Sequence, residues 1–225
     1  ITDNAMADVG KLTQLEALNL GATNIGDGGL AQLTELPHLQ RLVLANSQLT
    51  DKGLAHLAGH KTLLDLNLSS TAISDAGIES LLPLGKLISL SLATTAVSDE
   101  GVARFKDLRN LESLELSETP ITGTCLTQLA DVPGLKNMDL SLTLVTDDAL
   151  DQINHMESLR DLNLSGAPIT DAGLKKLHDS RHLERIDLFG TRVSEDAVAI
   201  LRKALPDTEI VATFDDGARE GTSAP

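Results

Sequence analysis

Two pairs of histidines have the spacing that comes closest to a metal site. His56 and His60, and likewise His178 and His182, are four residues apart, which on a helix places both side chains on one face. A zinc site needs a third ligand and supporting hydrogen bonds, and the sequence contains no H-E-x-x-H motif. We expect these histidines to lie on solvent-facing helices and to hold no metal.

The other reactive side chains form no catalytic arrangement. Gly26-Asp27-Gly28-Gly29 lacks both the spacing and the lysine of a phosphate-binding loop. Ser, His and Asp are plentiful, but no nucleophile elbow or pair of carboxylates stands out. The single cysteine, Cys125, rules out a disulfide framework and a thiolate cluster, and we expect it to be a small buried residue. We predict no enzyme activity, no metal and no cofactor.

A leucine recurs every 24 residues without interruption. A fixed period of this length is typical of a solenoid, in which each unit buries its apolar edge only by stacking on its neighbours. The recurring residues are Leu15, Leu39, Leu63, Leu87, Leu111, Leu135, Leu159 and Leu183.

Each repeat, numbered from that leucine, predicts a strand, a turn and a short helix. Positions 4 and 6 are apolar, as in Leu114 and Leu116, which predicts a strand over positions 3 to 6. Position 9 is mostly Thr, and we expect a ladder of hydroxyl-to-backbone bonds along the stack. Position 12 is mostly Ser or Thr, a helix N-cap, and position 13, as at Asp75, places a carboxylate at the helix start. Small residues at position 15, as at Gly77, let the helix approach the strands.

The phrase L-x-x-L-x-L-x-x-[TN]-x-[IL], present eight times, resembles the leucine-rich repeat family from about Leu12 to Leu205. The second half of the repeat, as at Ile169–Leu177, is similar to the subclass found in bacterial arrays and in F-box-associated receptors. The resemblance implies an α/β fold, a right-handed horseshoe-shaped solenoid. Because helices are wider than the strand spacing of roughly 4.8 Å, the parallel sheet is expected to be concave and the helices convex.

The repeats divide the chain into four parts. Residues 1–14 are a partial N-terminal repeat, 15–206 the eight full repeats, 207–214 a degenerate capping strand and 215–225 a flexible tail. Ile1-Thr2-Asp3 matches Ile169-Thr170-Asp171, so the chain begins inside a repeat. Targeting signals are therefore not visible, and the compartment is left open between secreted or periplasmic and cytoplasmic.

Composition excludes some partners. Hydrophobic residues make up 41% and aromatic residues only 1%, so the core must be aliphatic. The formal charge of −15 disfavours nucleic acid, which needs clustered Lys and Arg. No apolar run approaches the ~18 residues of a membrane span. We expect a monomer, although an exposed strand edge would allow a dimer.

Outward-facing positions 2, 3, 5, 7 and 8 line the predicted concave face and are free to differ between repeats. The carboxylates at Glu115, Asp139, Asp161 and Asp187 either steer a basic partner or form a solvated face. Apolar side chains at positions that are polar or small in most other repeats either contact a partner or reflect edge packing, self-association or neutral drift. The candidate partner-binding residues are Arg41, Leu64, Asp65, Asn67, Ile88, Glu115, Asp139, Leu142, Leu144, Asp161, Asn163, Arg185, Asp187 and Phe189.

Three functions fit this reading. By its resemblance the array is a protein-interaction module that binds a protein partner through its concave face. Alternatively it is a spacer or scaffold within a longer protein, or the non-catalytic substrate-recognition arm of a multidomain enzyme such as a ubiquitin ligase.

Overall fold

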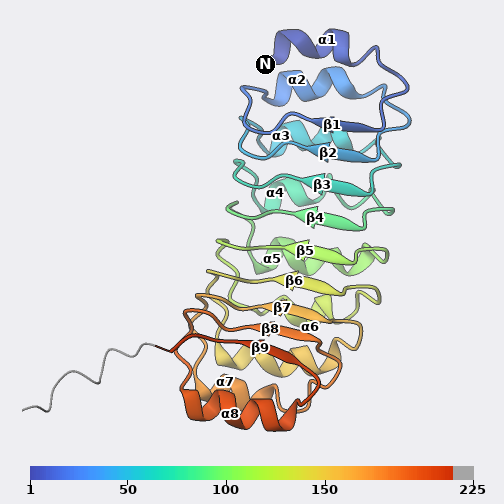
Figure 1. Ribbon diagram of the computed structural model, residues 1–225. Coiled ribbons are helices and arrows are strands. Elements are labelled where there is room, and N and C mark those ends of the chain that lie inside the picture. Colours follow the sequence, from blue (N-terminus) through green and yellow to red (C-terminus); the bar gives the residue numbers. More distant parts are fainter. Residues whose placement is uncertain (215–225) are drawn as a thin grey trace, which may run out of the picture.

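Parallel strands in sequence order form the spine of the molecule (Figure 1). In the computed structural model, which describes residues 1–214, nine strands make one sheet in the order β1 to β9. Figure 1 shows the helices following one another along the stack in the same order as the strands. This arrangement confirms the predicted α/β solenoid. The tail predicted for 215–225 lies outside the described residues.

The 24-residue period sets the register of the sheet. Each residue pairs with the residue 24 positions further on, as Leu42 does with Leu66, so equivalent side chains stack in columns. β9 pairs with β8 within the segment 207–214. The strands are β1 Ala17–Asn19, β2 Arg41–Val43, β3 Asp65–Asn67, β4 Ser89–Ser91, β5 Ser113–Glu115, β6 Asn137–Asp139, β7 Asp161–Asn163, β8 Arg185–Asp187 and β9 Glu209–Val211.

The helices are short because each has only one side of a repeat to cross. Ser74 caps its helix as predicted, accepting the backbone N–H of Ala76 at 3.4 Å. The α-helices are α1 Met6–Val9, α2 Asp27–Leu30, α3 Asp51–Leu54, α4 Asp75–Ile78, α5 Asp99–Val102, α6 Leu126–Leu129, α7 Asp171–Lys176 and α8 Glu195–Ala204. Stretches of 3₁₀ helix are Asp3–Ala5, Ala31–Leu33, Ala55–Leu57, Ala103–Asp107 and Asp147–His155. None of these helices is long and apolar enough to cross a membrane.

One continuous aliphatic core runs between the sheet and the helices. Its members are the stacked Leu, Ile and Val residues, and Leu114 in β5 is only 1% exposed. Phe105 is fully buried among them. Burying each such side chain contributes about 1.5–3 kcal/mol, and the stack reuses the same packing in every layer.

The column of threonines at position 9 stabilises the turn of its own repeat. The hydroxyl of Thr95 donates to the carbonyl of Leu92 at 2.7 Å, and that of Thr143 to Leu140 at 2.6 Å. Equivalent bonds recur at Thr23, Thr71, Thr119 and Thr191, which confirms the predicted series of hydroxyl-to-backbone bonds, and each bond closes the end of its own strand.

The acidic column at position 13 joins neighbouring repeats. The carboxylate of Asp75 accepts the backbone N–H of Ser98 at 2.8 Å and its hydroxyl at 2.6 Å. Asp27 binds Thr50 in the same way. These carboxylates lie in the first turn of their own helices, as predicted, but their hydrogen bonds go to the N-cap residue of the next repeat.

The glycine column at position 15 leaves room for these carboxylates. A Cβ atom on Gly101 would lie 2.3 Å from Oδ1 of Asp75, and one on Gly53 would lie 2.3 Å from Oδ1 of Asp27. A side chain at either position would collide with the carboxylate. The glycines are thus needed for contact between neighbouring repeats. This requirement is more specific than the predicted close approach of the helix to the strands.

The join between the fifth and sixth repeats departs from this pattern. Position 13 is Gly123, with φ +99°, and position 15 of the next repeat is Ala149. Thr146 occupies the position that an aspartate binds at other joins, and it makes no side-chain cap bond. The helix that follows, Asp147–His155, is 3₁₀ throughout. This join therefore lacks the carboxylate link found at most of the other joins.

Candidate functional site

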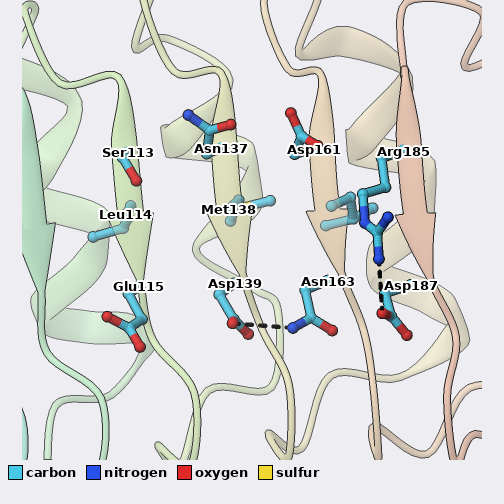
Figure 2. Close-up of a pocket in the computed structure, with 11 residues that line it drawn as sticks. Ser113, Leu114, Glu115, Asn137, Met138, Asp139, Asp161, Asn163, Arg185 and Asp187 are labelled. Carbon is cyan, nitrogen blue, oxygen red and sulfur yellow. Dashed lines mark hydrogen bonds and ion pairs between the residues drawn. The ribbon is translucent and has the colours of Figure 1, made fainter.

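A shallow groove crosses four strands on the concave face. It has a volume of about 380 Å³ and lies over β5 to β8. Figure 2 shows side chains from positions 3 and 5 of successive strands in two rows across it. The groove brings together six of the predicted partner-binding residues, namely Glu115, Asp139, Asp161, Asn163, Arg185 and Asp187.

Three position 5 side chains of this groove also accept hydrogen bonds from the backbone. Oδ1 of Asp139 accepts the N–H of Ser141 at 2.8 Å. Oδ1 of Asp187 accepts the N–H of Phe189 at 2.9 Å. Asn163 binds Ser165 in the same manner. A short Asn or Asp at position 5 therefore accepts a hydrogen bond from a backbone N–H of the turn. The column still differs between repeats, since Val43, Ser91 and Glu115 also occupy it.

Further hydrogen bonds run across the strands. Nδ2 of Asn163 donates to Oδ2 of Asp139 at 3.0 Å, the dashed contact between β6 and β7 in Figure 2. Arg185 approaches Asp187 at 3.5 Å and Glu209 at 2.9 Å. These contacts fix the side chains of the groove in place, so a partner meets a surface that is already organised.

Glu115 and Asp161 carry carboxylates that no turn depends on. Glu115 accepts a hydrogen bond from the hydroxyl of Ser91, which is itself hydrogen-bonded to Ser69. Asp161 accepts no side-chain or backbone hydrogen bond from the residues that the structure describes. These two carboxylates can be changed without breaking the backbone pairing of the groove.

The groove is negatively charged. It contains the carboxylates of Glu115, Asp139, Asp161 and Asp187, against the single guanidinium of Arg185. That guanidinium is shared with Glu209, outside the groove. A field of this sign attracts cations and speeds the approach of a basic partner.

Exposed apolar side chains lie in the loops that follow the carboxyl ends of these strands. Leu142 is 59% exposed, Leu144 57% and Phe189 57%. Pro120 and Pro168 occupy the neighbouring loops. We call these five residues the rim patch. All three large apolar members were predicted partner-binding residues.

The remaining predicted residues lie apart from the groove, on β2 to β4 or just before these strands. Arg41 pairs with Asp65 at 3.2 Å, and Asn67 accepts the N–H of Ser69 at 2.9 Å. Leu64 and Ile88 precede β3 and β4, and Ile88 is 40% exposed. The structure thus separates the candidates into a groove, a rim patch and this third group.

The histidine pairs do not share helices. His56 lies in the 3₁₀ helix Ala55–Leu57, whereas His60 follows it and is only 3% exposed. His178 and His182 both follow α7. The prediction of solvent-facing helical histidines is therefore wrong, because His60 occupies a position that carries Leu84 and Leu108 in other repeats and points into the core. Burial lowers the pKa of His60. Within residues 1–214, no cluster of three His, Cys, Asp or Glu could hold a metal.

Cys125 is buried, as predicted, and its thiol is poorly suited to nucleophilic chemistry. It is 1% exposed, and burial together with the nearby carboxylate of Asp99 raises its pKa. Burial opposes ionisation of Asp99, but hydrogen bonds from Thr122 and Cys125 outweigh it and lower the pKa of Asp99 to about 2.

Three further residues of this surface were not among the predicted ones. Ser91 is 7% exposed and supports Glu115, Ser165 donates to Asp187 at 2.8 Å, and Met138 lines the floor of the groove. Ser91 and Met138 break their columns, since other repeats mostly carry Asn or Asp at position 5 and Leu at position 4. These departures from the column pattern were the signal in the sequence that could have identified Ser91 and Met138.

Comparison with known proteins gives the class of the fold. Residues 35–58, 59–82 and 155–177 match the family model described as Leucine Rich repeat. No curated protein sequence matches the chain. Three of the repeats therefore match leucine-rich repeats, and the solenoid has the leucine-rich-repeat fold.

Several solved bacterial structures share the fold. Internalin C2 of Listeria monocytogenes is 20% identical, with a TM-score of 0.73 over 94% of this chain and 92% of that one. Another Listeria internalin is 15% identical, with a TM-score of 0.61 over 95% and 76%. A leucine-rich-repeat protein of Leptospira interrogans is 20% identical, with a TM-score of 0.66 over 92% and 56%.

Proposed function

We propose that this chain is a protein-recognition module that binds a basic partner protein in the groove over β5 to β8. The observation that carries the proposal is the arrangement of four carboxylates around one shared guanidinium on an open surface. Leucine-rich-repeat folds commonly serve as protein-interaction modules, which supports binding rather than catalysis.

The shape of the groove favours a protein over a small ligand. Small-molecule sites are concave and mostly apolar, and they enclose most of the ligand. This groove is shallow and polar, and it extends across four strands. Basic side chains from a partner would meet Glu115 and Asp161, whose charges are not needed to pair the backbone.

Affinity capture from the native source tests the proposal. The variant to compare with wild type is Glu115→Gln/Asp161→Arg, because arginine already occupies position 3 at Arg41 and Arg185. Asp139 is left intact because it holds Ser141. We expect a basic protein to be retained by the wild type and lost by the folded variant, with weaker retention at higher salt.

A matched control reverses one charge elsewhere. Asp131→Arg lies on an exposed return loop away from the concave face and should retain the same protein. Equal retention by wild type and the groove variant would contradict the proposal. That result would favour the scaffold, in which the concave face binds nothing tightly.

A further inference from the structure

We infer that the rim patch is a docking surface for an extended segment of the basic partner. In this arrangement apolar side chains of the segment pack on Leu142 and Leu144 while a Lys or Arg enters the adjoining groove. The inference rests on the proposed function, because the groove supplies its charged half.

The fold does not require the apolar residues of the rim patch. In a repeat array, a side chain that stacking demands recurs in its column, as Leu does at positions 1 and 6. Position 10 is instead polar or small in the first four repeats, and position 7 is Gly, Ala or Ser until Phe189. Position 8 is likewise small or polar except at Leu142. Three such departures occur within repeats 6 to 8.

Leu142 is 59% exposed and lies at a position of left-handed backbone. Its φ is +55°, the left-handed region that L side chains disfavour. All eight repeats have positive φ at this position, and only Gly166 and Gly190 fill it with glycine. A Cβ on Gly166 would meet Cδ2 of Leu142 at 2.5 Å, so the leucine lies across the bare backbone of the next loop.

The rim patch and the groove are continuous. Leu142 directly follows Ser141, whose N–H donates to Asp139, and the N–H of Phe189 donates to Asp187. The loops are joined in turn by backbone bonds, from Leu142 to Ser165 at 2.7 Å and from Gly166 to Phe189 at 2.8 Å. Three strand spacings separate the Pro120 loop from the Phe189 loop, roughly 14 Å.

Charge selects the occupant. The chain has a formal charge of −15, so a second copy docking here would bring like charge against the acidic groove. A basic segment meets complementary charge in the groove and apolar surface on the rim. An extended segment of roughly 4 or 5 residues spans the patch at about 3.3 Å per residue.

Selection from a displayed library of random twelve-residue peptides tests the inference. Wild-type protein should enrich peptides that combine Lys or Arg with large apolar residues. Synthetic versions of these peptides are then titrated against Leu142→Gly/Leu144→Gln. Glycine and glutamine already occur at the same repeat positions, at Gly166 and Gln48. The variant should therefore melt at the same temperature as the wild type. We expect its affinity to fall at least tenfold.

Two further variants separate the possible results. Ile200→Gln removes an apolar side chain of similar exposure, 53%, from α8 and should bind as the wild type does. Glu115→Gln/Asp161→Asn should weaken binding and reduce its dependence on salt. If the groove variant loses the peptides while the rim variant binds within twofold of wild type, the inference fails and the proposed function stands. If both variants bind normally, both fail.

Two other outcomes also overturn the inference. One is a selection that enriches no peptides, or only peptides without apolar residues. The other is concentration-dependent dimerisation of the wild type, measured by sedimentation, that Leu142→Gly/Leu144→Gln abolishes. In that case the occupant of the rim patch is a second copy of this chain.

Discussion

Gly123 and Ala149 form a pair that reverses the aspartate–glycine pair found at other joins. A Cβ on Gly123 would lie 2.3 Å from Cβ of Ala149, just as a Cβ on Gly101 would lie 2.3 Å from Oδ1 of Asp75. The space between adjacent helix starts therefore holds one side chain, from either repeat but not from both. Where the carboxylate is lost, a methyl group takes its place.

The first prediction concerns Gly101→Ala. The added methyl group collides with Asp75, and we expect a loss of about 1–3 kcal/mol in the free energy of unfolding, as for other overpacked sites. This loss should appear although alanine is the better helix former by roughly 1 kcal/mol. Urea denaturation measures it. A stabilised variant would show that the carboxylate moves aside freely.

The double variant Asp75→Gly/Gly101→Ala copies the Gly123–Ala149 pair. We expect its loss to be smaller than the sum of the two single losses by about 0.5–3 kcal/mol, because the alanine then fills the space that the carboxylate vacates. A double-mutant cycle in urea gives this coupling. Strictly additive losses would mean that the two positions do not compete for space.

A second prediction concerns Asp75→Ala alone. This change leaves the N–H of Ser98 without its acceptor, and we expect a loss of about 1–3 kcal/mol. The matched control is Glu100→Ala, which removes a nearby carboxylate that accepts no hydrogen bond among the described residues and only approaches Arg104 at 3.9 Å. Thermal melting of both variants distinguishes a specific bond from a general effect of charge.

Acid should weaken the link made by Asp99. Its pKa in the folded protein is about 2, below the ordinary value of 3.8, so the unfolded chain takes up a proton first as the pH falls. The stability from this group is therefore complete above about pH 5 and is lost as the pH drops from about 4 to 2.

The variant Asp99→Asn isolates that effect. We expect it to lower the free energy of unfolding by about 1–2 kcal/mol at neutral pH, through weaker hydrogen bonds to Thr122 and Cys125. The difference from wild type should shrink between pH 4 and pH 2. A difference that is constant over this range would argue against an ionised Asp99 as the acceptor.

The fourth prediction contrasts two leucines in adjacent repeats. Leu114→Ala removes a side chain that is 1% exposed in β5, and we expect a loss of about 2–5 kcal/mol from lost burial and the cavity left behind. Leu142→Gly, on the exposed rim, should lower the free energy of unfolding by less than about 0.5 kcal/mol, because no buried side chain is lost and glycine readily adopts the φ of +55°. Similar losses for both would contradict the division between core and binding surface.

Much of the fold was predictable because the 24-residue period fixes the register of the strands. Once Leu42 pairs with Leu66, every later strand follows in the same register, and the columns of Leu, Ile and Val must face one core. The N-caps at Ser74 and Thr50 were also predictable, because a hydroxyl directly before a helix can accept a backbone N–H of its first turn. These features depend on residues close in sequence, or on a repeat that makes distant residues equivalent.

The solenoid, its aliphatic core and the acidic character of the concave face follow from residue type and period alone. Which atoms meet across repeats depends instead on the folded arrangement of the side chains. The carboxylate of Asp75 binds Ser98, 23 residues away, and His60 turns into the core. Likewise, Asp139 serves a turn while Asp161 does not, although both are carboxylates on the same face. Such differences depend on side-chain direction and on distances of a few ångströms between neighbouring layers, which residue type and spacing do not specify.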